Sequence, residues 1–248
     1  MKTLGIIPAR YASTRFPGKP LANILGKPMI QRVYEQCKKC KSLTHVVVAT
    51  DDKRIAEVVK KFGGDVVMTS PSHQSGTDRC AEAAKKIGSS YDCVINIQGD
   101  EPLIQPQQIT TLIKLFSKKT TRIGTLVKKI HSLNELQDVS EVKVTLNKNN
   151  EALYFSRSPI PFVRNHELSQ WLANVSFYKH VGIYGYRTNT LKEIVRLPIS
   201  KLEKAEQLEQ LRWLENGYIV TTAETKFESF SVDIPDDIRV IEGRLKKS

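Results

Sequence analysis

Residues 4–20, LGIIPARYASTRFPGKP, decide the fold of this chain. They begin as a short apolar strand, residues 4–7, which we expect to end at Pro8. A loop of small residues follows, and it carries three cations, Arg10, Arg15 and Lys19. Small residues let backbone N–H groups approach a ligand closely, and the cations neutralise negative charge. The stretch therefore predicts a polyanion site just after the first strand of an α/β sheet, where such folds bind ligands.

The glycine pattern of this loop matches neither standard phosphate-binding motif. The dinucleotide-binding GxGxxG and the P-loop GxxxxGK[ST] are both missing from residues 4–20. An ordinary basic surface loop is the alternative explanation.

The composition is that of a globular protein. The chain has 248 residues, of which 40% are hydrophobic and 26% charged. No apolar run approaches the ~18 residues of a membrane span, and the N-terminal MKTLGIIPAR lacks the features of a signal peptide. We therefore expect a cytoplasmic protein with no membrane insertion.

The net charge of +12 could by itself indicate a nucleic-acid partner. Nucleic-acid binding needs clustered cations interleaved with aromatic residues on one face. The lysines instead come as scattered pairs, most of them at the ends of predicted helices, where a cation complements the helix dipole. We therefore expect no nucleic-acid partner. The pairs begin at Lys38, Lys60, Lys85, Lys118, Lys128 and Lys246.

Cys37 and Cys40 form the Cys-x-x-Cys spacing of zinc and redox sites. The pair falls late in a helical pattern, without a second pair or a nearby histidine cluster, whereas redox pairs lie at a helix N-terminus. We expect all four cysteines to be structural or incidental.

The first half alternates strands with helices. Continuous apolar runs at residues 45–50, 65–69 and 93–97 predict buried strands, and helices are expected at residues 51–62, 77–87 and 106–118, with another beginning at Pro28. This alternation is typical of a doubly wound, mostly parallel sheet over residues 1–120.

The second half has a different pattern. We expect strands at residues 123–130, 142–146, 152–155, 180–186 and 218–223, with a hairpin turn at residues 147–150. Helices are expected at residues 191–195 and 204–216, and a last helix with Pro235 at its first position. Residues 158–171 look irregular. No linker separates the halves, so we expect a single domain over residues 1–248, with a smaller mixed β lobe in the second half.

Two carboxylates follow predicted strands. Asp100, in QGDEP (residues 98–102), comes at the C-terminal end of a strand. Asp233, in ESFSVDIPDD, is expected just after another strand and before the last helix. One or two carboxylates together with substrate phosphates are the usual ligands of Mg²⁺. Asp100 could instead cap a helix or a turn. Ile234 would occupy the capping position of the last helix, which leaves Asp233 free to bind a metal ion.

The loop HQSGTDR, residues 73–79, has two explanations. Ser75 and Asp78 have the spacing of a capping box that begins a helix. Gly76 would also let a base ring lie against the backbone, and Arg79 extends from the first helical turn. In the second half, several residues each have an ordinary structural explanation and gain interest only beside the first half: Arg157, His180, Tyr184, Glu209 and Gln210.

Taken together, these segments carry a resemblance. IPARYASTRFPGKPL, VVVATDD, HQSGTDR, NIQGDEP, ALYFSR, HVGIYGYR, LEQLR and VDIPDD, in this order, resemble the 3-deoxy-manno-octulosonate (Kdo) cytidylyltransferase family. The resemblance implies a nucleotidyltransferase (GT-A-like), Rossmann-type α/β fold and the reaction CTP + Kdo → CMP-Kdo + pyrophosphate, which feeds lipopolysaccharide synthesis. It also implies a Mg²⁺-dependent homodimer, with CTP bound by residues 1–120 and sugar binding and dimerisation in residues 121–248.

The same resemblance implies roles for individual residues. Arg10, Arg15 and Lys19 would hold the triphosphate and, with Asp100, form the catalytic set. Asp100 and Asp233 would bind Mg²⁺. The substrate-binding set would be Ser75, Gly76, Arg79 and Gln98 on the nucleotide side, and Arg157, His180, Tyr184, Glu209 and Gln210 at the sugar acid. Ile234 departs from the threonine common in the family, and residues 158–177 match least and receive no role.

The chemistry of nucleotidyl transfer needs positioning and charge stabilisation more than a dedicated base. We therefore assign no histidine base and expect His180 to contact the sugar. The alternatives are a sialic-acid-type or sugar-1-phosphate nucleotidyltransferase, which would share the first strand and loop but not QGDEP with FSR and HVGIYGY, and a basic nucleic-acid-binding protein.

Overall fold

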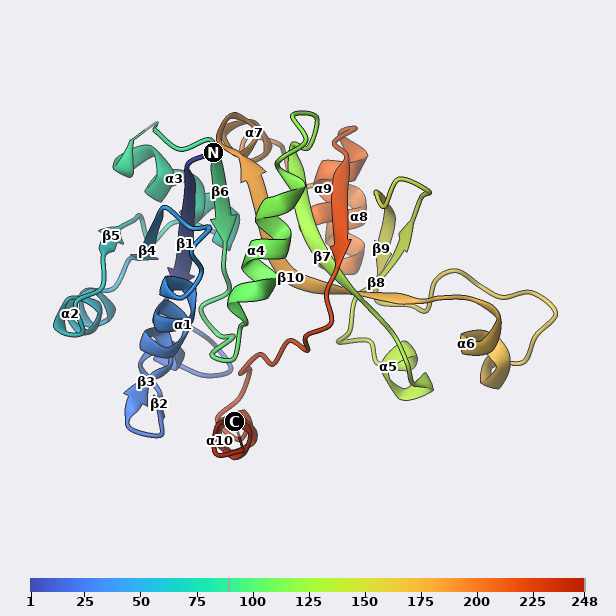
Figure 1. Cartoon of the computed structure of the whole chain (residues 1–248), viewed down its shortest axis with the longest axis horizontal. Coiled ribbons are helices and arrows are strands. Elements are labelled where there is room, and N and C mark those ends of the chain that lie inside the picture. The colour runs from blue at the N-terminus through green and yellow to red at the C-terminus, as the bar shows by residue number, and fades with distance from the viewer. Residues whose placement is uncertain (89, 248) are drawn as a thin grey trace.

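The computed structural model describes residues 1–88 and 90–247. Within these residues one nine-stranded sheet runs through the molecule in the order β11-β7-β10-β6-β1-β4-β5, with β8 and β9 joined to it beside β10 (Figure 1). The expected α/β fold with a mostly parallel sheet is confirmed for the first half. There β1 (Thr3–Ala9) pairs in parallel with β4 (His45–Thr50) and β6 (Cys93–Asn96), and β4 pairs in parallel with β5 (Val66–Met68).

The first strand is longer than the sequence predicts. It does not end at Pro8, because Pro8 and Ala9 still pair with Ala49 and Thr50 of β4. The pairing of β1 with β6 stops at Ile6, whose carbonyl accepts the N–H of Ile97. Pro8 lies two residues further along β1, on the side that faces β6, where the pairing has already ended. The lack of an N–H group in proline therefore removes no hydrogen bond from the sheet.

Helices cover both faces of the sheet and give the molecule three layers (Figure 1). One apolar cluster lies beneath α1 (Met29–Lys38), α2 (Lys53–Lys61) and α4 (Pro106–Leu115). The other lies beneath α3 (Gly76–Ile87), α7 (Thr188–Ile194) and α9 (Gln210–Glu215). The side chains of β1 alternate between the two clusters, because successive residues of a strand point to opposite faces of the sheet. Ile7 packs in the first cluster, and Leu4 and Ile6 pack in the second.

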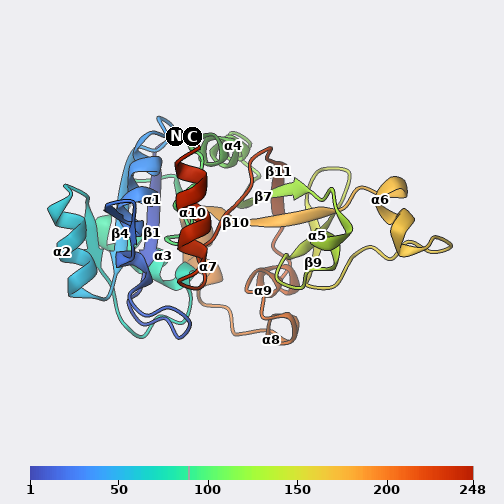
Figure 2. The ribbon, with the colours of Figure 1, turned by 90° about the horizontal axis from the view of Figure 1, so that it is seen from below.

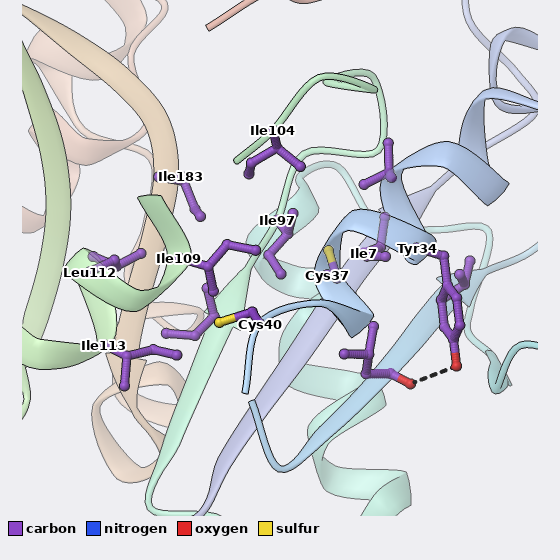
Figure 3. Close-up of a cluster of buried hydrophobic side chains, with 14 of the residues drawn as sticks. Ile7, Tyr34, Cys37, Cys40, Ile97, Ile104, Ile109, Leu112, Ile113 and Ile183 are labelled. Carbon is purple, nitrogen blue, oxygen red and sulfur yellow. Dashed lines mark hydrogen bonds between the residues drawn. The ribbon is translucent and has the colours of Figure 1, made fainter. Parts of the chain in front are cut away.

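The cysteines belong to this core. Figure 3 shows Cys37 and Cys40 among isoleucine and leucine side chains, and both are buried free thiols. Burial raises the pKa of Cys37 far above its usual range, so the thiol stays protonated. Among residues 1–88 and 90–247 no group of three or more His, Cys, Asp or Glu side chains could hold a metal ion. Their burial in the core supports a structural role for Cys37 and Cys40.

Strands of the second half belong to the same sheet. β10 (Tyr178–Arg187) lies antiparallel between β6 and β7 (Ile123–Lys129), and β11 (Val220–Glu224) is parallel to β7. The hairpin of β8 (Lys143–Leu146) and β9 (Ala152–Ser156) is confirmed. The short helices α5 (Leu133–Gln137) and α6 (Trp171–Asn174) extend to one side around a separate small cluster of Ile130, Leu136, Val163, Trp171 and Phe177 (Figure 1).

Three predictions in the second half were wrong in detail. The strand expected just before Asp233 is irregular chain, because residues 228–232 pair with no neighbouring strand of the described chain. The helix expected at residues 204–216 is two helices, α8 (Lys201–Glu206) and α9, because Gln207 adopts a left-handed backbone with φ 54°. The last helix, α10 (Asp237–Leu245), has Asp236 at its N-cap, so Pro235 is not its first helical residue. The carboxylate of Asp237 accepts the N–H groups of Asp233 and Ile234 and so orders the turn before the helix.

Several short elements were not predicted: α5, α6, the hairpin of β2 (Asn23–Ile24) and β3 (Lys27–Pro28), and the 3-10 turns η1 (Lys19–Leu21) and η2 (Leu168–Gln170). Figure 2 shows the sheet from below, with α10 lying across the end of it. None of the helices in the described part of the chain is long and apolar enough to cross a membrane.

Candidate active site

A pocket of about 330 Å³ opens where β1 and β6 end. Parallel strands meet at this edge, so loops that are distant in the sequence come together there. The pocket gathers the first-half residues that the sequence predicts, and Asp233 from the second half. Its lining includes Arg10, Arg15, Lys19, Ser75, Gly76, Arg79, Gln98, Asp100 and Asp233.

The loop after β1 is closed at its base by Tyr11. The Tyr11 carbonyl accepts the N–H groups of Ser13 (3.0 Å) and Gly18 (2.9 Å). Gly18 has φ 71°, and a Cβ there would lie 3.1 Å from the Tyr11 ring. The guanidinium of Arg54 stacks on the same ring, 3.3 Å from its centroid. The loop is therefore anchored to α2 while its cations face the pocket.

Two cations of this loop pair with the two predicted metal ligands. Lys19 Nζ lies 2.6 Å from Asp100 Oδ2 and 3.8 Å from Asp233 Oδ1. Arg15 Nη2 lies 3.0 Å from Asp233 Oδ1. The side chain of Lys19 is 15% exposed and that of Arg15 is 67% exposed, so the lysine lies inside the pocket and the arginine at its mouth.

The carboxylates of Asp100 and Asp233 fit a magnesium site. They contact the same ammonium group, so they lie close enough together to serve a single cation. Mg²⁺ keeps several waters and takes one or two carboxylates plus substrate phosphates, so two carboxylates beside a loop with three cations suffice to fit it.

The loop before α3 forms the predicted capping box. Ser75 Oγ accepts the N–H of Asp78 (3.1 Å), and Asp78 Oδ2 accepts the N–H of Ser75 (3.3 Å). A Cβ on Gly76 would lie 3.4 Å from the Pro8 ring, so the glycine lets the helix begin close against β1. The helix N-terminus thus faces the pocket, where its dipole favours an anion.

Arg79 forms the wall of the pocket rather than reaching into it. Its side chain is 4% exposed and lies 3.4 Å from Asp51 Oδ1. Its Nη1 also donates to Thr69 Oγ1 at 2.6 Å. These contacts fix α3 to the ends of β4 and β5. A direct substrate contact by Arg79 stays a prediction.

The QGDEP loop presses directly on β1. A Cβ on Gly99 would lie only 2.8 Å from the Pro8 carbonyl oxygen, so the site needs glycine for close backbone approach. Behind Asp100, the side chain of Glu101 is buried, and burial together with the neighbouring charge of Asp100 raises its pKa to about 7. Ser229 donates a hydrogen bond to Glu101 Oε2.

Of the predicted sugar-acid residues, His180, Tyr184 and Glu209 lie near one another behind the pocket. The His180 and Tyr184 rings are 5.0 Å apart, and Thr77 Oγ1 donates to Glu209 Oε2 at 2.6 Å. Burial raises the pKa values of Glu209 and Tyr184, and the charge of Glu209 adds to the effect on Tyr184. The Tyr184 hydroxyl is buried with no hydrogen-bond partner among the described residues.

His180 is held neutral. Burial lowers its pKa to about 3. Its Nε2 lies 2.9 Å from Thr125 Oγ1, and that hydroxyl also lies 2.8 Å from the carbonyl oxygen of Ile183, to which it donates. The imidazole Nε2 therefore carries the proton, which leaves Nδ1 as an acceptor.

Arg157 and Gln210 make none of the contacts described for His180, Tyr184 and Glu209. Arg157 Nε donates to the Glu206 carbonyl (2.9 Å), and Nη1 donates to the Val139 carbonyl (3.0 Å). Gln210 is the buried first residue of α9. None of the five second-half residues predicted at the sugar acid is among the described residues that line the 330 Å³ pocket, and their roles stay predictions.

Comparisons with known proteins identify the family. The cytidylyltransferase family model matches residues 4–228. A 3-deoxy-manno-octulosonate cytidylyltransferase of Parabacteroides distasonis is 57% identical over 242 residues, which cover 96% of each chain. The protein of that name from Bacteroides thetaiotaomicron is 56% identical and covers 99% of each chain.

The chain belongs to the 3-deoxy-manno-octulosonate cytidylyltransferase family.

A solved structure supports membership of this cytidylyltransferase family. The structure of CMP:2-keto-3-deoxy-manno-octonic acid synthetase complexed with CTP matches with a TM-score of 0.92 at 42% identity, and covers 100% of this chain and 99% of that one. The 4-diphosphocytidyl-2C-methyl-D-erythritol synthase of Anaerococcus prevotii is 11% identical with a TM-score of 0.63, and shares the fold alone. The predicted family is confirmed, and the comparisons do not favour the other nucleotidyltransferases or a nucleic-acid-binding protein.

Sequence reasoning missed residues that shape this cytidylyltransferase pocket. Tyr11 closes the loop, Glu101 and Ser229 join two segments behind Asp100, and His73 lines the pocket with its Nε2 against Glu82. The ion pair with Lys86 leads the interactions that lower the pKa of Glu82 to about 2. Tyr11 and Glu101 lie inside motifs quoted from the sequence, but their partners are distant in the chain and no local spacing indicates them.

Proposed function

We propose that the chain transfers the cytidylyl group of CTP to Kdo, releasing pyrophosphate, with Mg²⁺ as its cofactor. The observation that carries the proposal is the contact of Lys19 with both Asp100 and Asp233 in the pocket after β1. A triphosphate brings negative charge that needs the cations, and it offers phosphate oxygens that complete a metal site built on two carboxylates. The full-length relatives supply the identity of the substrates.

In this reaction the attacking hydroxyl of the sugar acid forms a bond to the α-phosphorus of CTP. The bond between that phosphorus and the bridging oxygen breaks, pyrophosphate leaves, and the hydroxyl proton passes to solvent. Arg10, Arg15 and Lys19 bind the triphosphate and stabilise the charge that develops on the leaving group. Mg²⁺ held by Asp100 and Asp233 would neutralise phosphate charge and lower the pKa of the attacking hydroxyl.

The nucleotide lies, in this proposal, against the N-terminus of α3, with Ser75, Gly76 and Gln98 around the cytidine. The sugar acid lies toward β10 and α9, near Arg157, His180, Tyr184, Glu209 and Gln210. Neutral His180 offers an acceptor and Glu209 a carboxyl group, which suits a polyhydroxylated ligand. His180 is hydrogen-bonded to Thr125 and does not line the pocket, so we assign it no role as a base. Its contact with the sugar acid is proposed from the family resemblance.

Lipopolysaccharide synthesis, a cytoplasmic location and a homodimer belong to the same proposal. Exposed apolar side chains of the second half, Leu153 (61% exposed) and Phe162 (76% exposed), support an interface there. Sedimentation at micromolar concentration measures the assembly, and a species with the 28.1 kDa mass of one chain would contradict the homodimer.

The activity is tested by measuring pyrophosphate release with CTP, UTP, ATP and GTP, each with and without Kdo and Mg²⁺. Release is expected with CTP only when both Kdo and Mg²⁺ are present. Release with Kdo that is no faster for CTP than for the other nucleotides would overturn the CTP assignment. Release that is unchanged by a chelator would overturn the metal assignment.

A further inference from the structure

A segment of irregular chain connects the sheet to the last helix. Residues 228–233, here called the strap, follow β11 and cross the end of the sheet to reach α10 (Figure 1). The strap carries Asp233, one of the two proposed metal ligands. It has no place in a β ladder, so its position depends on other contacts.

The strap is attached to the QGDEP loop beside Asp100. The N–H of Val232 donates to the Asp100 carbonyl at 2.9 Å, and Lys19 Nζ donates to the Val232 carbonyl at 2.8 Å. At the start of the strap, Glu228 forms ion pairs with Lys128 on β7 and Lys179 on β10. Each end of the strap therefore has an anchor of its own.

Between these anchors, the Ser229 hydroxyl donates to Glu101 Oε2. Glu101 is 6% exposed and follows Asp100 directly in the chain. Its other carboxyl oxygen faces β10, since a Cβ on Gly182 would lie 3.8 Å from Glu101 Oε1. Glu101 does not line the pocket, and no cation of residues 1–88 or 90–247 lies within ion-pair distance of it.

A buried carboxyl group without a cation is costly, and an apolar residue at position 101 would suit the stability of this core better. The carboxyl group instead makes one directed bond, to the strap. We propose that Glu101 is a positioning residue that, through Ser229, fixes the strap against the QGDEP loop and so sets the spacing of Asp100 and Asp233. This inference rests on the proposed function, because it concerns the two carboxylates assigned to Mg²⁺.

The proposal is tested by metal binding in the absence of turnover. Mn²⁺ is titrated into the enzyme with CTP but without the sugar acid, and free Mn²⁺ is measured by electron paramagnetic resonance. Glu101→Ala and Ser229→Ala are each expected to weaken Mn²⁺ binding about tenfold or more, the usual cost of losing an outer-shell partner of a metal site. The double variant is expected to be no weaker than Glu101→Ala, because both changes remove the same bond. Glu101→Gln, whose amide oxygen can accept from Ser229, is expected to recover most of the affinity.

Tyr218→Phe is the matched control. It also removes a hydrogen bond from a hydroxyl to a glutamate, between Tyr218 and Glu193 (3.1 Å), but away from the strap. In steady state, Ser229→Ala should raise the Mg²⁺ concentration for half-maximal rate and leave KM for Kdo unchanged, whereas Tyr218→Phe should change neither value.

The outcomes separate this proposal from the proposed function. If the unsubstituted enzyme binds Mn²⁺ with CTP and Ser229→Ala binds it equally well, the positioning role is wrong and the proposed function stands. Additive losses in the double variant would also overturn the positioning role. If the unsubstituted enzyme binds no Mn²⁺ in the presence of CTP, the metal assignment itself fails. Ser229→Ala decides the matter should Glu101→Ala fail to fold.

Discussion

The ammonium group of Lys19 lies 2.6 Å from the carboxylate of Asp100, although the two residues are 81 positions apart in the chain. The pair places a cation from the loop after β1 against the carboxylate that follows β6. Lys19 donates to the strap as well, at the carbonyl of Val232. One side chain thus joins the three segments that carry the loop cations Arg10, Arg15 and Lys19 and the two carboxylates.

Replacing Lys19 tests its part in charge stabilisation. Lys19→Ala is expected to lower kcat by ~10²–10³, because a preorganised cation facing the developing charge is lost. Lys27→Ala is the control, since Lys27 pairs with Glu35 on the exposed surface at 2.8 Å, and kcat should then be unchanged. Pyrophosphate release at saturating CTP and Kdo measures both. A kcat near that of the unsubstituted enzyme in Lys19→Ala would remove Lys19 from the mechanism.

The neutral imidazole of His180 predicts a loss of stability in acid. Burial lowers its pKa from the ordinary 6.5 to about 3, so below pH 6.5 the unfolded chain binds a proton that the folded chain does not. The free energy of unfolding therefore falls as pH decreases from 6.5 toward 3. By linkage the loss at pH 5 is at most about 2 kcal/mol from this residue.

Urea unfolding at pH 7.5 and pH 5 measures this effect. His180→Asn is expected to lose less stability between the two pH values than the unsubstituted chain. The exposed His131 provides the control, and His131→Asn should keep the full acid sensitivity. Equal acid sensitivity in all three proteins would contradict the assignment of a neutral His180.

Gly18, in the loop after β1, and Gly26, in the turn between β2 and β3, allow the effect of backbone strain to be separated from that of side-chain crowding. Both have positive φ, 71° and 81°, so an alanine at either position costs about 1–2 kcal/mol of stability. At Gly18 the new Cβ also meets the Tyr11 ring, at 3.1 Å, whereas at Gly26 no atom of the described residues lies within 4 Å. We expect Gly18→Ala to raise KM for CTP and Gly26→Ala to leave it unchanged. A similar KM in both variants would show that Tyr11 does not set the shape of the loop.

Much of the fold can be predicted from local sequence, and the limits of that prediction have physical causes. The run HVVVAT is a strand over the expected residues, and Ser75 caps α3 with the expected box, because apolar runs and capping depend on near neighbours. The antiparallel pairing of β10 with β6 and β7 depends on tertiary packing, so it could not be predicted from local sequence. The break at Gln207 likewise places a single residue in a left-handed backbone.

Some residues of the candidate site could likewise be predicted from the sequence, and others could not. The three loop cations and Asp100 could be predicted to meet, because they lie on the loops after β1 and β6, whose ends share one edge of a parallel sheet. The sequence placed Asp233 just after a strand, and the structure brings it to the pocket on irregular chain instead. Glu101 could not be predicted, since its partner Ser229 lies 128 positions away and the strap has no periodic pattern.

Gly99 offers a direct test of how tightly the QGDEP loop must lie against β1. Gly99→Ala would place a methyl group 2.8 Å from the Pro8 carbonyl oxygen, closer than a carbon and a backbone oxygen can approach. Neither atom belongs to a flexible side chain, so the loop must move away from β1 and carry Asp100 with it. Because small displacements of reacting groups cost up to about 10²-fold, we expect kcat to fall by roughly that factor.

Gly243→Ala is the control for Gly99→Ala. Gly243 lies within α10, where a Cβ would meet no atom within 4 Å among the described residues outside the backbone of its own helix. Alanine there is expected to stabilise the helix by up to about 1 kcal/mol. Its kcat should match that of the unsubstituted enzyme. If Gly99→Ala keeps full kcat while thermal unfolding confirms that it is folded, close approach of the loop to β1 is not needed for catalysis, and Asp100 tolerates displacement.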